Sequence, residues 1–138
     1  MQNQRGYTLT EVIITIIIIS ILVTFALPRY TNTSEKSRVG DGVQILTVLL
    51  GAQKSYQFEN NVYSAGDCTA LDVSIPPATA TSNFTDPICA SNAAKAIVTI
   101  QRTGGLYTLG IKTNGSICCN DGTQTLCTKI GYPTTCPP

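Results

Sequence analysis

The chain begins with one long apolar run from which polar residues are almost absent. Residues 12–27 read VIITIIIISILVTFAL, and the polar side chains among them are those of Thr15, Ser20 and Thr24. Such hydroxyls can donate a hydrogen bond back to a carbonyl of their own helix. A bilayer-spanning helix needs about 20 mostly apolar residues, and a helix satisfies its own backbone in lipid. We therefore predict a transmembrane helix over residues 7–30.

Helical periodicity continues past the apolar run but becomes amphipathic. Pro28 cannot donate to the helical ladder, so we expect a kink or a locally unwound stretch there. Residues 31–37 are polar, and apolar side chains then recur at helical spacing at Val39, Val43, Ile45, Leu46, Leu49, Leu50, Ala52 and Tyr56. One stripe can face a globular domain while another faces sister helices. Residues 31–59 thus extend the helix, which should run from about Thr8 to Glu59 over roughly 75–80 Å.

Residues 60–138 have the pattern of a small globular head. Turn and breaker residues dominate a loop at 60–95, whereas 96–101 (AIVTIQ) and 106–112 (LYTLGIK) read as strands. The dipeptide Asn114-Gly115 predicts a hairpin turn that leads into a third strand and completes a sheet within 96–119. We expect an α+β fold. A long N-terminal helix would pack on an antiparallel sheet of about three strands, followed by a disulfide-bonded C-terminal loop at 118–138.

All of the cysteines lie in the head. The six are Cys68, Cys89, Cys118, Cys119, Cys127 and Cys136. In a chain that leaves the cytosol, this number indicates two or three disulfides. We expect Cys68 to pair with Cys89 and close the long loop. One of Cys118 and Cys119 should join Cys127, and the other should join Cys136. Zinc is the alternative, but the tail lacks the C-x₂₋₄-C pairs usual in zinc sites.

Charge and residue types exclude several classes of function. Nine Lys and Arg balance eight Asp and Glu, and histidine is absent. This balance argues against direct nucleic-acid binding, and the absence of histidine removes imidazole catalysis and imidazole metal ligands. No nucleophile has a base beside it, so we expect no catalytic residues, no metal and no cofactor. Two alternatives stay open: calcium at scattered acids, and modification at N-x-S/T triplets. The residues concerned are Asp67, Asp72, Asp86 and Asp121, and Asn32, Asn83 and Asn114.

The residues around the apolar run do not fit an ordinary secretory signal or a plain anchor. A cleaved signal would have one basic residue and an acid before the run, and FALPRY at its end lacks an A-x-A site. A plain anchor explains the apolar length but neither Glu11 nor the glycine before Tyr7. A third interpretation is cleavage in front of the apolar run.

Arg5-Gly6 followed by Tyr-Thr-Leu-Thr-Glu resembles the class III leader junction of type IV pilins and type II secretion pseudopilins. The resemblance implies a leader at residues 1–6 that prepilin peptidase removes between Gly6 and Tyr7. Tyr7 would become the N-methylated first residue, and Glu11 would be the family glutamate. Tyr7 replaces the usual phenylalanine. Pro28 falls where many pilins carry a helix-kinking or helix-melting proline.

Glu11 has a physical role if this resemblance holds. An unpaired carboxylate inside a bilayer costs about 2.5 kcal/mol or more. Leader removal would expose an amine at Tyr7, and the Glu11 of a neighbouring subunit could pair with it. Relief of the cost of the lone charge would then favour assembly. The pairing itself would set the axial stagger between neighbouring subunits. Alternatively, Glu11 sits in a first helical turn, is helped by the helix dipole and snorkels to the interface.

The resemblance implies a structural subunit that polymerises with itself through residues 7–50 into a type IV pilus. The alternative is a type II secretion pseudopilin forming a periplasmic pseudopilus, and a more distant one is a membrane-anchored binding module or enzyme. The implied partners are the inner membrane before assembly, prepilin peptidase, and the pilus or secretion machinery. The implied location is first a single pass through the inner membrane and then the extracellular pilus. The cysteine-rich tail favours the pilus, whereas the stretch QKSYQFENNVYS leans toward the pseudopilin.

Overall fold

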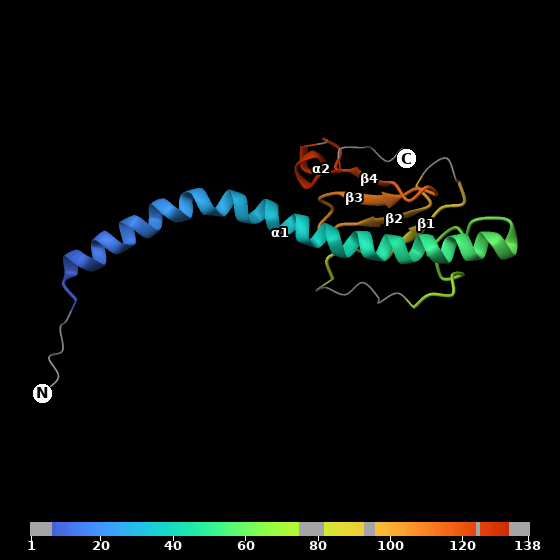
Figure 1. Ribbon diagram of the computed structural model, residues 1–138, viewed down its shortest axis with the longest axis horizontal. Helices are drawn as coiled ribbons and strands as arrows, with labels where there is room; N and C mark the ends of the chain where they lie inside the picture. The colour runs from blue at the N-terminus through green and yellow to red at the C-terminus, as the bar shows by residue number, and fades with distance from the viewer. Residues whose placement is uncertain (1–6, 75–81, 93–95, 124, 133–138) are drawn as a thin grey trace, which may run out of the picture. The chain divides into compact units, whose positions relative to one another are not determined.

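The computed structural model describes residues 7–74, 82–92, 96–123 and 125–132. Its elements are α1 (Leu9–Asn60), β1 (Ile88–Cys89), β2 (Val98–Gln101), β3 (Thr108–Ile111), β4 (Ile117–Asn120) and α2 (Thr125–Ile130) (Figure 1). The chain forms two compact units, one ending at Ser34 and the other beginning at Glu35. A long helix followed by an antiparallel sheet confirms the predicted α+β class.

The helix α1 has 52 residues and begins and ends within one residue of the predicted bounds. Its backbone stays helical through Pro28. Of the two expectations stated for Pro28, a kink or a locally unwound stretch, the unwound stretch is therefore wrong. Proline removes one backbone hydrogen bond, and the turns on either side keep theirs, so the helix continues.

The sheet has four strands in the order β1-β2-β3-β4, and every neighbouring pair is antiparallel. The three predicted strands correspond to β2, β3 and β4, whereas β1 lies in the segment predicted to be a loop. A strand of two residues is too short to show an alternating pattern. The hairpin turn is confirmed: Gly115 adopts φ 84° and donates to the Lys112 carbonyl at 2.9 Å.

The core of the head lies between the sheet and the amphipathic part of α1 (Figure 1). The helix contributes Val39, Leu46, Leu49 and Leu50, and the sheet region contributes Ile97, Val98, Ile100, Tyr107, Leu109 and Ile111. These side chains are buried, which confirms that one helical stripe faces the globular domain. Gly42 belongs to the same stripe, because a Cβ there would lie 2.7 Å from the Phe84 ring.

Two disulfides cross-link the described part of the head. Cys68 pairs with Cys89, and Cys119 pairs with Cys127, as predicted. Cys118 is also disulfide-bonded. Its predicted partner, Cys136, lies outside the described residues.

The helix α2 is absent from the sequence-based prediction. It has six residues, and the Asp121 carboxylate accepts hydrogen bonds from the backbone N–H groups of Leu126 and Cys127 at 2.6 and 3.0 Å. Such a short helix shows little periodicity. Local carboxylate capping and the disulfide at Cys127 hold it in place.

Candidate assembly site

Residues Leu9–Leu27 form a helical segment that is long and apolar enough to cross a membrane. Its mean hydropathy is 2.5, and none of its residues is buried by the rest of the described chain. The hydroxyls of Thr15, Ser20 and Thr24 in this segment donate to carbonyls one turn earlier. Thr15 bonds the Val12 carbonyl at 2.8 Å, and Ser20 bonds that of Ile16 at 2.6 Å. These three hydroxyls thus present no unsatisfied donor to lipid, as predicted. The remaining surface is apolar on all sides, so lipid or other protein must cover it.

Glu11 and Thr8 form a reciprocal cap at the start of α1. The Thr8 backbone N–H and hydroxyl donate to Glu11 Oε2 at 2.9 and 3.0 Å. In return, the Glu11 N–H donates to the Thr8 hydroxyl at 3.3 Å. This is the capping box that the pattern Thr-x-x-Glu before an apolar run encodes. The prediction for Glu11 named the helix dipole and not this cap, although the pattern Thr8-x-x-Glu11 is visible in the sequence.

The cap leaves half of the Glu11 carboxylate available. Within the described residues, Oε2 accepts both Thr8 bonds, and no hydrogen bond reaches Oε1. Tyr7 directly precedes the capped turn, and its side chain is 88% exposed. A cation from outside the chain could therefore bind Glu11 without breaking the cap. Gly6, on the other side of the predicted cleavage bond, lies outside the described residues.

Glu35 is the centre of the main charged network of the head. It accepts from Arg102 Nε at 3.2 Å, from Tyr107 Oη at 3.3 Å and from the neighbouring Arg38 guanidinium. Burial would raise the pKa of Glu35, but the hydrogen bonds from Arg102 and Arg38 outweigh it and place the pKa below its ordinary value. Burial, aided by the Glu35 charge, raises the pKa of Tyr107 to about 12. The network therefore keeps its charges through the physiological pH range.

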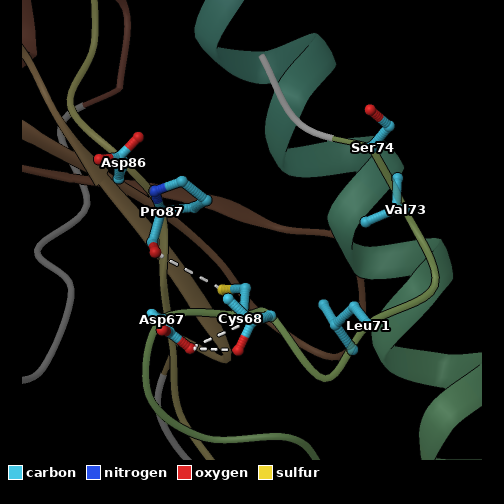
Figure 2. A pocket seen from close by; sticks show the side chains of 8 residues that line it. Asp67, Cys68, Leu71, Val73, Ser74, Asp86 and Pro87 are labelled. Atoms are coloured by element: carbon cyan, nitrogen blue, oxygen red, sulfur yellow. Dashed lines mark hydrogen bonds between the residues drawn. The ribbon is translucent and has the colours of Figure 1, made fainter. Parts of the chain in front are cut away.

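A pocket of about 510 Å³ lies beside Cys68 in the second compact unit. Figure 2 shows Asp67 and Asp86 on one side of it and Leu71 and Val73 on the other. The Asp67 carboxylate is hydrogen-bonded within its own loop. It accepts from the Thr69 hydroxyl at 2.7 Å and from the Thr69 backbone N–H at 3.3 Å. These bonds lower the pKa of Asp67.

Across the described part of the chain, no three His, Cys, Asp or Glu side chains gather as a metal site would require. Of the four acids named for calcium, Asp67 and Asp86 line the same pocket, but no third side chain of these types joins them in the described structure. The chemical features that converge on one place are instead those of the N-terminus: an apolar helix, a capped carboxylate and the adjoining Tyr7.

The comparisons with known proteins point to the same segment. Residues 1–27 match the family model of the prokaryotic N-terminal methylation motif. The chain is 33% identical to the type II secretion system core protein G of Vibrio cholerae over 67 residues, which are 49% of this chain and 46% of that protein. The chain thus spans about half the length of this relative.

Two pilus proteins are similar over more of the chain. The fimbrial protein EcpC of Eikenella corrodens is 29% identical over 83% of this chain and 67% of its own length. The type IV wide pilus major component PilA4 of Thermus thermophilus is 26% identical over 76% of this chain and 79% of its own length. No solved structure gives a significant match. The chain therefore carries the prokaryotic N-terminal methylation motif, and its homologues are type IV pilins and the type II secretion core protein G.

Proposed function

We propose that this chain is a prepilin-type structural subunit that polymerises into a type IV pilus. Prepilin peptidase would hydrolyse the Gly6–Tyr7 bond, and the freed Tyr7 amine would be N-methylated. The methylation motif over residues 1–27 supports this proposal. So does Tyr7 itself, which is exposed and lies before the start of α1, where an enzyme can reach it.

The observation that carries the proposal is the Glu11 carboxylate at the start of an apolar helix. Its cap with Thr8 uses one oxygen and leaves the other for a cation. In the assembled fibre, that cation would be the Tyr7 amine of a neighbouring subunit. Pairing removes the cost of a lone charge in an apolar surrounding, so it favours packing of helices in register.

A pilus is favoured over a secretion pseudopilus by the extent of the similarity. The two pilus proteins align with 83% and 76% of the chain, whereas the secretion core protein G of Vibrio cholerae aligns with 49%. The disulfides of the head also suit an extracellular position. In this proposal the subunit waits in the inner membrane and later forms the fibre together with the pilus machinery. Its role is mechanical and not catalytic.

Intact-mass measurement with N-terminal fragmentation, made on fibres sheared from cells, tests this function. We expect a chain that begins at N-methylated Tyr7 and lacks six thiol hydrogens, because all six cysteines would be paired. A matched Gly6→Ala chain should keep its leader and stay in the membrane. A native chain that still begins at Met1, or is cut behind the apolar run, would overturn the proposal. Processed subunits found only in the cell envelope would favour the pseudopilus.

A further inference from the structure

The turn between β3 and β4 carries a dipeptide that the proposed function does not use. Asn114 is the one asparagine of this sequence that precedes a glycine, since every other asparagine precedes a residue with a side chain. Asn114, Gly115 and Ser116 are all exposed to solvent. Gly115 adopts φ 84°, a backbone conformation that favours glycine. The hairpin geometry therefore favours a pair of residues in which the asparagine amide is open to attack by the next backbone nitrogen.

The side chain of Asn114 is held in a way that suits an electrophile. Its Oδ1 accepts a hydrogen bond from the Ser116 backbone N–H at 2.9 Å. A donor at this oxygen stabilises the negative charge that develops there when a nucleophile attacks the amide carbon. Among the described residues, no hydrogen bond holds Asn114 Nδ2, so this nitrogen is free to leave. Asn83 provides the contrast, because its Nδ2 donates to Asp41 at 3.3 Å.

The nitrogen placed to attack is that of Gly115, because it follows Asn114 directly. Gly115 has no Cβ to crowd the approach, and the nearest atom to a Cβ built there would be Leu50 Cδ2 at 4.0 Å. In the folded turn the Gly115 N–H donates to the Lys112 carbonyl at 2.9 Å. This bond must open before the nitrogen can attack. The turn is exposed, so it can open locally while the buried strands stay paired.

We propose that the Asn114–Gly115 pair is a site of spontaneous covalent modification, at which the chain converts its own asparagine to aspartate and isoaspartate. The Gly115 nitrogen gives up its proton and bonds to Asn114 Cγ. The Cγ–Nδ2 bond breaks, and Nδ2 leaves as ammonia with that proton, so a succinimide ring remains. Water then opens the ring. Hydrolysis of the new bond to Cγ gives aspartate, whereas hydrolysis of the original peptide bond gives isoaspartate. The only co-reactant is water.

The two products affect the hairpin differently. Aspartate keeps the backbone, and its carboxylate can still accept from the Ser116 N–H. Isoaspartate adds one methylene to the backbone of the turn. The length of a hairpin loop fixes the register of its strands, and here that register pairs Leu109 with Cys119, both fully buried. Isoaspartate should therefore weaken the pairing of β3 with β4, and both products add a negative charge to the exposed turn.

Incubation of the detergent-solubilised full-length chain at mildly alkaline pH tests this site. Peptide mass mapping measures loss of the amide, and enzymatic methylation from S-adenosylmethionine detects isoaspartyl carboxylates. Asn120 is the matched comparison, because its Oδ1 accepts from the Gly122 N–H at 3.1 Å in the same way but it precedes Asp121. We expect Asn114 to lose ammonia at least about tenfold faster than Asn120. The rate should rise with pH, because the Gly115 nitrogen must lose its proton.

Two variants locate the reaction. Asn114→Ser keeps an oxygen that can accept from the Ser116 N–H but has no amide, so it should abolish the isoaspartyl signal. Asn120→Ser should leave that signal unchanged. The proposal is overturned by an Asn114 that stays an amide in the folded chain while it converts in the chain unfolded in urea, because the turn would then protect it. Equal rates at Asn114 and Asn120, or a sugar bound to Asn114 Nδ2, would also overturn it. The reaction needs no second subunit, so these outcomes do not depend on fibre formation.

Discussion

Arg102 and Glu35 form an ion pair across 67 residues of sequence, with Arg102 Nε 3.2 Å from Glu35 Oε2. Arg102 follows β2, and Glu35 is the first residue of the second compact unit. The same guanidinium donates to the Asn83 carbonyl at 2.9 Å, and the Tyr107 hydroxyl completes the site. The Glu35–Arg102 pair therefore joins α1, the segment before β1 and the β2–β3 hairpin to one another.

Removing the charge of Glu35 should destabilise the head. Glu35→Gln keeps the shape but weakens three charge-assisted contacts, so we expect a loss of about 1–3 kcal/mol in the free energy of unfolding at neutral pH. Chemical unfolding of the detergent-solubilised chain measures this. The control is Glu59→Gln, which changes an exposed carboxylate and should have little effect.

The same pair predicts a pH dependence. The pKa of Glu35 is lower in the folded chain than its ordinary value. Its contribution is therefore complete above the unfolded pKa of about 4.3 and is lost as pH falls through the folded value. The stability difference between the native chain and Glu35→Gln should shrink on acidification from about pH 5 to pH 3. A difference that stays constant over this range would refute the assignment.

The charge of Glu11 and its capping role can be separated. Glu11→Gln retains a side chain that can complete the capping box but carries no charge. We expect leader removal and membrane insertion to continue while fibre assembly is lost. Thr8→Ala removes the cap, at a cost of about 0.5–2 kcal/mol, but leaves the charge, so fibres should still form. For both variants, intact mass measures leader cleavage, and the yield of sheared fibres measures assembly. Normal fibres from Glu11→Gln would contradict the pairing with the Tyr7 amine.

Gln53 should be one of the most sensitive positions in the head. It is fully buried, and its amide donates to the Ser64 carbonyl at 3.0 Å and accepts from the Ser64 N–H at 2.9 Å. Gln53→Leu leaves both backbone groups unpaired away from water, which should cost about 2–4 kcal/mol. The same change at exposed Gln44 should alter the unfolding free energy of the unassembled subunit by less than about 0.5 kcal/mol. Equal effects at both positions would disprove the bridging role.

The disulfides should differ in their contribution according to the loops they close. Cys68 and Cys89 are 21 residues apart, whereas Cys119 and Cys127 are 8 apart. Loop-closure entropy then predicts a loss of about 3.3 kcal/mol for a Cys68→Ser/Cys89→Ser chain and about 2.5 kcal/mol for a Cys119→Ser/Cys127→Ser chain. Thermal unfolding of the two paired variants tests the order. A larger loss for the shorter loop would show that local packing around α2 dominates.

The sequence by itself determined those elements that are long or that carry a strong local pattern. An apolar run of membrane length, a helical repeat at Leu46 and Leu50, and the dipeptide Asn114-Gly115 specify local structure through backbone and burial rules that act over neighbouring residues. The pairing of Cys68 with Cys89 was also accessible, because both cysteines bracket one long loop. Thr8 and Glu11 encode their cap within four residues, although that pattern was overlooked.

Only the tertiary structure decided features whose partners are far apart in sequence. The two-residue strand β1 exists because β2 and the Cys68 disulfide hold it, and Glu35 finds Arg102 only after the sheet has packed on α1. The choice of Cys119 over Cys118 for Cys127 depends on which face of β4 each side chain points to, since neighbouring residues in a strand point in opposite directions. Such contacts follow from packing of the whole head, and no local pattern records them.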